Sequence, residues 1–596
     1  MKYMKYSPTL RHLAAVCTFA CISLGAGAQG IVKEVEGIRD FAPDKRPATR
    51  IETAPESIDP SLNSVRPGYS RTSTAVDVPP TLSVMGLTAG ESIYPRPASR
   101  GYAAAGYFPK GDINLSAGYR IIDREKLTLN LWGQMCRNYF HGRLLGETEK
   151  VRLTTTDIAA GLSTAYSAGK AGVLRASTSY SYSMFNYPGR VMLPASQRVG
   201  IYRLQAAWDG KAGSNLTYGA EGRLGYTGYA KDAVATPYFD TQRQVRSQDE
   251  ISGRIGAWID FKCSDRINLM LDITYEGASR NKAFDSKQIN MTADELILRK
   301  GVISVTPKVG FTGQHMSGHL GFNYSAATGN AKGSNFGADI AWDWLLSNYF
   351  AINIKAASGP VVNEFDRLFA LSRYAMPAYG IGLSYVPIDA EASLRLLAIK
   401  GFTMSLGAGY AAANDWMSTG LIHNIYIDQI HIDNLPTFSS ADLYALRFLA
   451  SIGYRYGDKV EVEVSAEHTN CDYEEGIDFS GQKFYNWTDR AYYRNPDRAT
   501  TIIRASALWH PIKSVTLSAG YEYRTGRSIA SLDVEQIARL LPLGDISRLS
   551  VGAHWQITQM LGVYGRVEGL LQESYLQANG MPGQRLCPLV GLTLKF

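Results

Sequence analysis

Residues 100–596 are dominated by a repeating pattern in which apolar and polar side chains alternate. In the range 514–524, every second residue from Val515 to Tyr523 is apolar or aromatic, and the residues between them are small, polar or charged. The ranges 460–467 and 267–275 show the same split. Successive side chains of a strand point to opposite faces, so in a membrane barrel one face meets lipid and the other meets water. The pattern predicts an all-β fold, a large antiparallel transmembrane β-barrel over residues 100–596.

Strand length separates this prediction from a soluble β-sandwich, whose strands average about five or six residues. Many of the alternating runs reach ten residues or more, as a tilted membrane strand requires. The connections alternate as well, with short turns at one end and long loops at the other, which is typical of bacterial outer-membrane barrels. Short turns are predicted at Asp123–Lys126, Ala168–Gly172, Gly210–Asn215 and Lys262–Arg266, and long loops at Asn138–Val151, Asn186–Arg198, Tyr229–Gln248, Ser279–Arg299, Ser358–Met376, Ala413–Ala441, Cys471–Asp497 and Thr525–Asp545.

From Gly101 to Phe596 we expect about 22 strands (roughly 20 to 24), an even number that returns both chain ends to the periplasm. The final residues add their own signal. Val590, Leu592, Leu594 and Phe596 alternate with smaller or polar residues, and the sequence stops on the aromatic ring. This resembles the C-terminal strand that the barrel assembly machinery of the outer membrane recognises. We therefore expect Phe596 to act as an assembly signal, and the protein to be a multi-pass barrel of a Gram-negative outer membrane.

The first hundred residues divide into two parts. Lys2, Lys5 and Arg11 precede the apolar range 13–25, and Ala-Gly-Ala follows at 26–28, so residues 1–28 are predicted to be a signal peptide. Residues 29–99 hold nine of the 24 prolines. Proline fixes φ and removes a backbone donor, which excludes regular sheet or a long helix. The segment 29–99 is expected to be an extended, proline-rich periplasmic segment.

Composition excludes several other classes. Charged residues make up 19% of the chain, and after the first thirty residues no apolar run has the length of about 20 residues that a membrane helix needs. The net charge of +7 is spread along the chain, which argues against a nucleic-acid partner. The four cysteines beyond the signal peptide are too far apart for a zinc site or a disulfide scaffold. Outer-membrane lipid and the assembly machinery are the partners expected, with a periplasmic or surface protein as a third.

The motifs of catalysis and metal binding are weak. His315 and His319 have the i, i+4 spacing of a helical zinc pair but stand at a predicted strand-to-strand turn, and an acidic loop cluster that could bind calcium lacks the EF-hand spacing. These residues are therefore interpreted as incidental polar residues of turns and loops. No phosphate-binding loop or nucleophile elbow occurs, so we predict no enzyme activity, no cofactor and no metal site. The ligand-like residues are His315, His319, His423, His431, Asp433, Asp472, Glu474, Glu475 and Asp478.

Charged residues on the polar face of the strands are the candidate functional set, because they are expected to face the lumen. Charged rings in a pore can select ions or solutes, and opposite charges can instead pair across the lumen and hold the barrel in shape or grip a plug. Of these two readings, pairing is favoured for individual residues. The predicted lumen-facing residues are Arg120, Glu221, Arg223, Arg254, Asp260, Asp272, Glu461, Glu463, Glu467, Glu522, Arg524, Arg548, Arg566 and Glu568.

A barrel of this size behind a signal peptide resembles the TonB-dependent receptor family of outer-membrane transporters, over residues 100–596. The leader around Val35–Pro43 and Ile51–Pro55 resembles that of a branch lacking the plug domain. The family plug is larger than the segment that precedes this barrel, and no TonB box stands near Gln29. The resemblance implies a transport barrel, channel-like or receptor-like, without a full plug. Its lumen would be filled by the N-terminal segment, by inward loops or by a second protein. The alternative is a structural or assembly barrel that anchors a periplasmic or cell-surface complex.

Overall fold

The computed structural model describes residues 100–596 except 109–110, 188–195, 231–247, 281–298, 332, 348, 376–381, 397–400, 423–424, 428–429, 433–434, 458, 480–492, 495–498, 533–537, 572–574, 578–579 and 585. The predicted signal peptide and the proline-rich segment 29–99 lie outside the described residues. Within the described residues no helix is long and apolar enough to cross a membrane.

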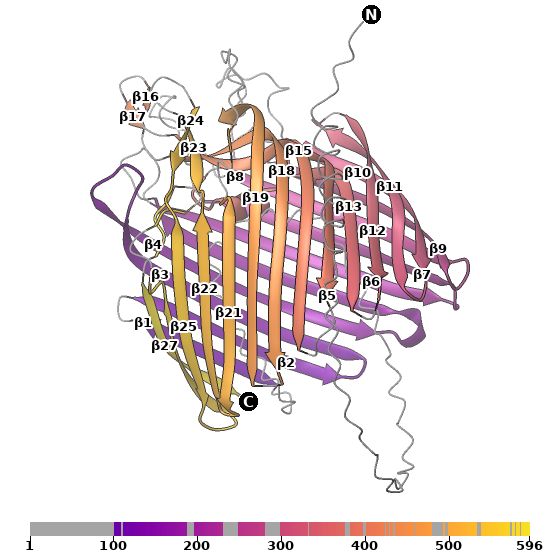
Figure 1. The fold of residues 1–596 in the computed structure, drawn as a ribbon, viewed down its shortest axis with the longest axis horizontal. Helices are drawn as coiled ribbons and strands as arrows, with labels where there is room; N and C mark the ends of the chain where they lie inside the picture. Colours follow the sequence, from indigo (N-terminus) through magenta and orange to yellow (C-terminus); the bar gives the residue numbers. More distant parts are fainter. Residues whose placement is uncertain are drawn as a thin grey trace, which may run out of the picture. The chain divides into compact units, whose positions relative to one another are not determined.

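The described chain forms a closed antiparallel barrel of 22 strands, as the alternating pattern predicts (Figure 1). Strands adjacent in sequence pair with each other, and the last strand pairs with the first between Tyr102↔Lys595 and Tyr107↔Val590. The barrel strands are β1 (Gly101–Phe108), β2 (Asp112–Arg124), β3 (Leu127–Arg143), β4 (Lys150–Ser167), β5 (Val173–Asn186), β6 (Ser196–Ala212), β7 (Leu216–Tyr229), β8 (Gln248–Lys262), β9 (Ile267–Arg280), β10 (Arg299–Thr312), β11 (Met316–Gly329), β12 (Ser334–Leu345), β13 (Phe350–Val362), β14 (Leu383–Leu396), β15 (Phe402–Ile422), β18 (Leu435–Tyr456), β19 (Val460–Phe479), β21 (Thr501–Ile512), β22 (Val515–Thr525), β25 (Ile546–Gln556), β26 (Leu561–Glu568) and β27 (Cys587–Lys595).

Short additional elements stand between the barrel strands. They are the 3-10 helix η1 (Gly169–Ala171), the helix α2 (Phe365–Leu371), and the strands β16 (Ile425–Ile427), β17 (Ile430–Ile432), β20 (Tyr493–Arg494), β23 (Ser528–Leu532) and β24 (Ala538–Pro542). The turns at 125–126 and 263–266 lie at the end of the barrel that also holds Arg100 and Phe596. This is the periplasmic end, because short turns and both chain ends gather there in outer-membrane barrels.

Several of the predicted loops are wrong because strands continue through them. The range Ala413–Ala441 holds the ends of β15 and β18, which stay paired from Trp416↔Ala441 to Ile422↔Leu435. β19 extends through Cys471 to Phe479, β3 reaches Arg143, and a β23–β24 hairpin occupies most of Thr525–Asp545. Beyond the membrane both faces of a strand meet water or protein, so the lipid-driven alternation ends while backbone pairing continues.

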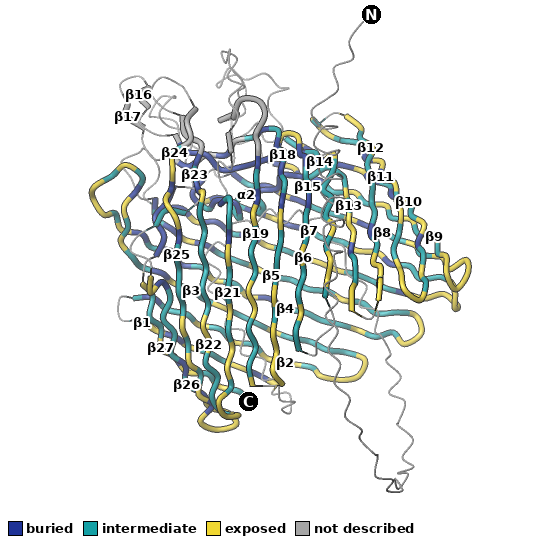
Figure 2. Tube along the Cα trace, in the orientation of Figure 1, coloured by how far each residue is buried: buried dark blue, intermediate teal, exposed yellow. Residues whose placement is uncertain are grey.

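The outward face carries the apolar belt that a bilayer requires. Side chains such as Ile255, Leu269 and Val590 are exposed, at 68%, 48% and 64% of their surface, and they alternate with less exposed residues along each strand (Figure 2). Exposed aromatic rings form two girdles, which is where barrels carry them in a membrane. The periplasmic girdle contains Tyr119, Tyr166, Phe261, Trp344, Tyr349, Phe350, Tyr454, Tyr456, Trp509, Trp555 and Phe596, and the outer girdle contains Tyr107, Tyr180, Tyr202, Tyr226, Tyr275, Tyr324 and Phe336.

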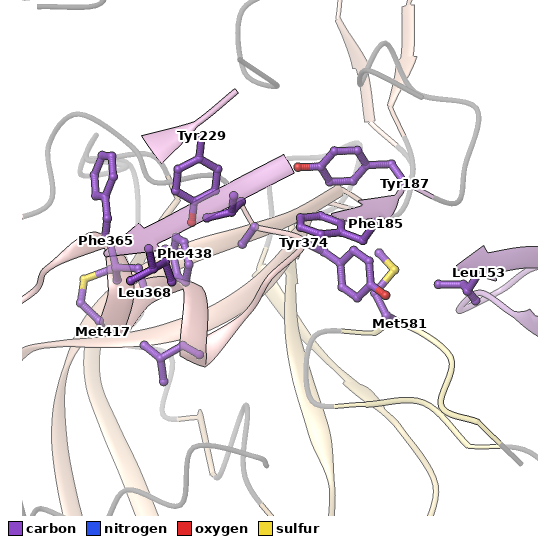
Figure 3. Packing of buried hydrophobic residues seen from close by; sticks show 14 of the residues in the cluster. Leu153, Phe185, Tyr187, Tyr229, Phe365, Leu368, Tyr374, Met417, Phe438 and Met581 are labelled. Carbon is purple, nitrogen blue, oxygen red and sulfur yellow. The ribbon is translucent and has the colours of Figure 1, made fainter. Parts of the chain in front are cut away.

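The buried apolar core lies inside the outer end of the barrel. One cluster joins upper residues of β4 to β7 with α2 and with Met581 of the β26–β27 connection (Figure 3). A second cluster joins Leu421 of β15, Ile529 of β23 and Leu543, with Leu576 packed against it. Two connections therefore fold into the barrel and supply its core, and they define the candidate site.

Candidate functional site

The connection between β13 and β14 turns into the barrel and carries helix α2. We call its described part, residues 363–375, the inward segment. Phe365, Leu368 and Leu371 are buried on one side of the helix. Their spacing of three residues places them on one face, since a helix has 3.6 residues per turn. The predicted loop Ser358–Met376 contains this segment, although β13 continues to Val362, and the sequence analysis missed the helix and its inward course.

Three ion pairs join the inward segment to the barrel wall. The Arg223 guanidinium donates to Glu364 at 2.6 Å, and Arg203 donates to Asp366 at 3.2 Å. Arg373 lies 3.1 Å from Asp157 on β4. These contacts attach both ends of the segment to β4, β6 and β7, so it is latched to the wall rather than only packed against it.

A buried ion pair holds the beginning of α2. The Glu250 carboxylate accepts the Phe365 backbone N–H at 2.6 Å and pairs with Arg280 at 3.0 Å. The two charged side chains are 1% and 3% exposed. The Arg280 guanidinium also lies 4.5 Å from the centre of the Phe365 ring, a cation–π contact. Lys300 donates to the Asn363 carbonyl. A buried charge is tolerated only when paired and hydrogen-bonded, and here both conditions are met.

Aromatic rings complete the packing of the inward segment. The Tyr374 and Phe185 rings meet edge to face with centroids 5.4 Å apart, and Phe185 meets Tyr187 at 5.5 Å. Tyr229 contacts Phe365 at 5.8 Å in the same geometry (Figure 3). Such ring pairs contribute about 0.5–1.5 kcal/mol each beyond the area they bury.

The charges on the inward segment have shifted proton affinities. Burial raises the pKa of the Glu364 carboxyl to about 8, and the neighbouring Asp366 carboxylate adds to the rise, while Arg223 opposes it. Burial lowers the pKa of Arg367, whose guanidinium lies 5.0 Å from the Trp416 ring centre. Burying a charge costs free energy, so the stability of the docked segment depends on the protonation state of its charged groups.

The connection between β26 and β27 is the second part of the closure. Gln584 donates to the buried Asp112 carboxylate at 2.7 Å, and Asp112 also accepts the Tyr139 backbone N–H at 2.5 Å. Arg527 donates to the Leu576 carbonyl at 2.5 Å. Met581 packs into the same cluster as α2, so the two connections share one core.

The residues predicted to face the lumen mostly have partners of opposite charge. Arg223 contacts Glu276 at 3.6 Å in addition to Glu364, Arg254 contacts Glu221 at 3.1 Å, and Asp272 contacts Lys308 at 2.9 Å. Glu568 accepts from both Arg548 and Arg566, Glu522 accepts from Arg524, Glu461 pairs with Arg455, and Arg120 pairs with Asp123. Asp260 accepts from Asn268, Glu467 accepts from Thr469, and Glu463 has no ion pair among the described residues.

Arg223 is the one predicted residue that contacts the inward segment directly. The other charged wall residues that contact that segment are Asp157, Arg203, Glu250, Arg280 and Lys300, which the sequence analysis did not select. Glu250, Arg280 and Lys300 stand at the ends of β8, β9 and β10, where the pattern fades, whereas Asp157 and Arg203 lie well within β4 and β6. The sequence signal that could have indicated a buried segment was the presence of the apolar Phe365, Leu368 and Leu371 in an expected surface loop.

The ligand-like residues do not form a metal site in the described part of the chain. His319 contacts Asp339 at 3.0 Å, and no group of three or more histidine, cysteine or acidic side chains gathers there. Cys136, Cys263, Cys471 and Cys587 are free thiols. The side chains of His423, His431, Asp433, Asp472, Glu474, Glu475 and Asp478 lie outside the described residues.

Comparison with known proteins places the fold. No protein-family model and no curated protein matches the sequence. Among solved structures, the FrpB iron transporter of Neisseria meningitidis (F3-3 variant) is similar with a TM-score of 0.58 at 13% identity, covering 84% of this chain and 82% of that one. The ferric enterobactin receptor PfeA of Pseudomonas aeruginosa (Q482A mutant) gives 0.60 at 9% identity, covering 84% and 82%. The siderophore receptor PirA of Acinetobacter baumannii gives 0.59 at 9%, covering 84% and 81%.

These structures share the barrel, and identities of 9–13% establish the fold alone. The closed 22-strand barrel, the apolar belt and the two aromatic girdles agree with that comparison. The described part of this chain is an outer-membrane β-barrel with the fold of the TonB-dependent receptors.

Proposed function

We propose that this protein is a solute-transport barrel of the outer membrane that lacks a full plug domain and closes its outer end with its own connections. The observation that carries the proposal is the latch of the inward segment, in which Glu364, Asp366 and Arg373 pair with wall residues of β7, β6 and β4. A barrel that only anchored other proteins would need no charged latch inside its lumen.

The charged wall supports the same proposal. The arginines and carboxylates on the polar face of the strands are arranged in pairs, such as Arg254 with Glu221 and Arg548 with Glu568. We propose that these residues line a water-filled path below the inward segment. Paired charges keep such a path polar and hydrated, and because they cancel they produce no strong net electric field that would favour cations over anions or the reverse.

We propose that the barrel lets solutes pass and does not catalyse a reaction. The proline-rich segment 29–99 is shorter than a plug, so the connections inside the barrel would perform the closing role. The neighbouring structures are named as iron and siderophore receptors, and that substrate is theirs. For this chain we propose solute passage without assigning iron.

The test is ion conductance of the purified full chain in planar bilayers. A double variant, Arg203→Gln with Arg223→Gln, removes two of the three latches while keeping the side chains polar. We expect small or brief currents from the natural protein and larger, longer ones from the variant. The matched control is Arg455→Gln, which breaks the Arg455–Glu461 pair near the periplasmic end and leaves the inward segment attached.

Absence of current from all three proteins, each shown to be folded and inserted, would contradict transport. That outcome would favour the alternative of an anchoring barrel. Equal currents from the latch variant and the control would retain a channel but would show that the inward segment does not close it.

A further inference from the structure

The outer ends of β3, β4 and β6 carry a group of basic side chains on their outward face. All six are exposed, and within the described part of the chain no ion pair joins any of them to a carboxylate. We call this group the basic patch. Its members are Arg137, His141, Arg143, Lys150, Arg152 and Arg198.

Cross-strand register brings four members of the basic patch together on the β3–β4 hairpin. His141 lies directly opposite Arg152, and Arg143 lies directly opposite Lys150. The Asn186 amide of β5 donates to the Arg152 carbonyl at 2.7 Å, so this end of the hairpin is bonded to the neighbouring strand. Four basic side chains are therefore grouped on one hairpin that is attached to the barrel wall.

The remaining two members stand in one register row. Arg137 on β3 faces Thr156 on β4, and Arg198 on β6 faces Met184 on β5. Thr156 and Met184 face each other, so the four residues form a continuous row. Neighbouring strands lie about 4.8 Å apart, so the row spans about 14 Å. The basic patch thus covers an area of the wall rather than a single strand.

Alternation along the strands shows that the basic patch faces outward. Arg152 lies six positions from Ile158 on β4, and Arg198 lies four positions from Tyr202 on β6. Ile158 and Tyr202 are exposed on the lipid-facing side, and residues an even number of positions apart share a face of the strand. Leu153, the residue after Arg152, points inward and is buried. The other four members follow the same spacing on β3 and β4.

The basic patch stands just beyond the outer aromatic girdle. Arg198 is four residues farther out than the girdle residue Tyr202, which corresponds to about 13 Å along the strand. With a strand tilt of about 40°, the separation along the membrane normal is about 10 Å. The polar zone of a bilayer extends about 5–8 Å beyond its hydrocarbon on each side, so these long side chains reach the headgroups. Below them the wall exposes apolar side chains, including Leu131, Leu162 and Leu204.

The positive charge is concentrated on this side of the barrel. At the outer ends of β19, β21, β22 and β25, the outward positions carry three hydroxyl groups and one histidine that hydrogen-bonds a threonine. They are occupied by His468, Thr501, Thr525 and Ser547. A charge that served only solubility would be mixed in sign and spread around the rim.

Few carboxylates lie near the basic patch. Glu147 and Glu149 belong to the β3–β4 connection, and in the described residues neither makes an ion pair with the patch. Asp249, on the outward face of β8, accepts a hydrogen bond from the Tyr226 hydroxyl. Six basic side chains beside so few carboxylates leave this part of the outer rim positively charged.

A basic area above an apolar wall matches an amphipathic anion. The arginine guanidinium donates two parallel hydrogen bonds to a phosphate, and a lysine ammonium adds a point charge. Basic residues at a membrane surface attract anionic lipids, while exposed leucines below them pack against acyl chains. A small free anion would meet only the charges, whereas a phosphorylated lipid would meet both surfaces at once.

We propose that the basic patch binds a phosphorylated lipid of the outer leaflet. Its phosphates would contact Arg137, Arg152 and Arg198, and its acyl chains would lie on the apolar wall below. The site lies on the outside of the barrel, so it is independent of the transport function proposed above. It requires only that the barrel stands in an outer membrane.

Native mass spectrometry of the full-length protein in detergent tests the proposal. The probe is lipid A carrying two phosphates, and phosphatidylethanolamine, which has acyl chains but no net charge, is the comparison lipid. We expect lipid A to bind at least about tenfold more tightly than phosphatidylethanolamine. An excess of inorganic phosphate should not displace it, because the free ion lacks the acyl chains.

The triple variant Arg137→Gln, Arg152→Gln and Arg198→Gln should weaken lipid A binding about tenfold or more, because each basic residue near an anionic headgroup adds to the attraction. Lysine at the same three positions should keep most of the binding, since the positive charges remain. This second variant separates the loss of charge from any change in the wall itself.

The matched control removes three positive charges at the periplasmic end. Arg124→Gln, Lys170→Gln and Arg266→Gln change exposed residues in or beside short turns, so the net charge falls by the same amount. Lipid A binding should be unchanged in this control. Heat-modifiable gel mobility confirms that each variant is folded.

Equal binding of lipid A and phosphatidylethanolamine would overturn the proposal, and so would an equal loss in the triple variant and the control. Displacement of lipid A by inorganic phosphate would overturn it as well, because the patch would then bind a simple anion. Absence of lipid binding would favour an acidic protein as the partner and would also contradict the proposal. None of these measurements depends on passage through the barrel, so they leave the conductance test to decide transport separately.

Discussion

Gly101 and Phe596, at opposite ends of the barrel sequence, exchange two backbone hydrogen bonds. The Gly101 N–H donates to the Phe596 carbonyl at 2.7 Å, and the Phe596 N–H donates to Gly101 at 3.0 Å. The Phe596 ring covers Gly101, and it stacks on Tyr119 with centroids 6.1 Å apart. The terminal residue therefore completes the seam as well as the periplasmic girdle.

Removing Phe596 is expected to reduce assembly more than stability. The deletion costs one bonded pair and one ring contact out of a seam that still joins Tyr102 to Tyr107 with β27. The measurement is outer-membrane yield at low expression, together with heat-modifiable gel mobility. Normal yield at normal mobility would show that the terminal ring is not an assembly signal.

The two faces of β22 are expected to tolerate arginine differently. Leu517 faces Ala553 and Trp509, and the exposed Trp509 ring marks that face as the lipid side. Because Leu517 lies opposite Trp509 of the periplasmic girdle, Leu517→Arg should destabilise the barrel by less than the about 2–4 kcal/mol expected at mid-membrane and by more than Thr516→Arg on the wet face. Urea unfolding in detergent or bilayers compares the two. Equal effects would show that the strand does not lie in a bilayer, and a larger cost for Thr516→Arg would show that the faces are assigned the wrong way round.

The pair Glu250–Arg280 is expected to be essential for the inward segment. Its side chains are 1% and 3% exposed, so removing one partner leaves a buried charge unpaired, at a cost of about 3–5 kcal/mol. Arg280→Met alone should therefore destabilise the protein more than Arg280→Met combined with Glu250→Leu. The free energies of unfolding of the two variants test this prediction. A double variant that is no more stable than the single variant would contradict it.

Docking of the inward segment is expected to depend on pH. The pKa of Glu364 rises from its ordinary value to about 8 in the docked segment, so docking favours the protonated carboxyl. A raised pKa means that this stabilisation is full below about pH 4.5 and is lost as the pH rises through about 8. Asp366, Glu276 and Glu250 surround the carboxyl, and Arg223 opposes their effect.

Conductance between pH 6 and pH 9 measures this dependence. Opening should increase toward pH 9 in the natural protein, and Glu364→Gln, which stays neutral, should remove most of the increase. If the pH dependence were unchanged in Glu364→Gln, a group other than Glu364 would be responsible for it.

The N-terminal segment gives a further expectation. Mature protein should begin at Gln29, and deleting residues 29–98 should make the barrel leakier, because we expect this proline-rich chain to help fill the lumen. Uptake of a hydrophilic antibiotic by cells carrying the deletion measures the leak. Unchanged uptake would show that the connections inside the barrel are a sufficient closure.

The alternation of residues was enough to predict the barrel, its strand number and the pairing of the last strand with the first. Residues 515–523 and 267–275 carry a signal set by lipid on one side and water on the other. Opposite charges such as Arg548 and Glu568 pair between the neighbouring strands β25 and β26, whereas the sequence favoured pairing across the lumen. These features follow from local pattern and from closure of the sheet.

The inward segment could not be predicted from the same pattern. Its place depends on partners far away in sequence, such as Arg223 for Glu364 and Asp157 for Arg373. A seven-residue helix is too short for a periodic signal, and its apolar side chains are explained only by the core that they enter.

The inward segment is bounded by β13 and β14, so it remains tethered to the barrel at both ends. Because the inward segment is tethered, its effective concentration at its own docking site is in about the millimolar range. Closing a short loop takes about 10–100 ns in a flexible chain, so reclosure is fast unless docking itself is slow. Such a closure would produce brief, frequent openings rather than a lasting pore. The fraction of time that the barrel is open would then be set by how long a solute stays in the path.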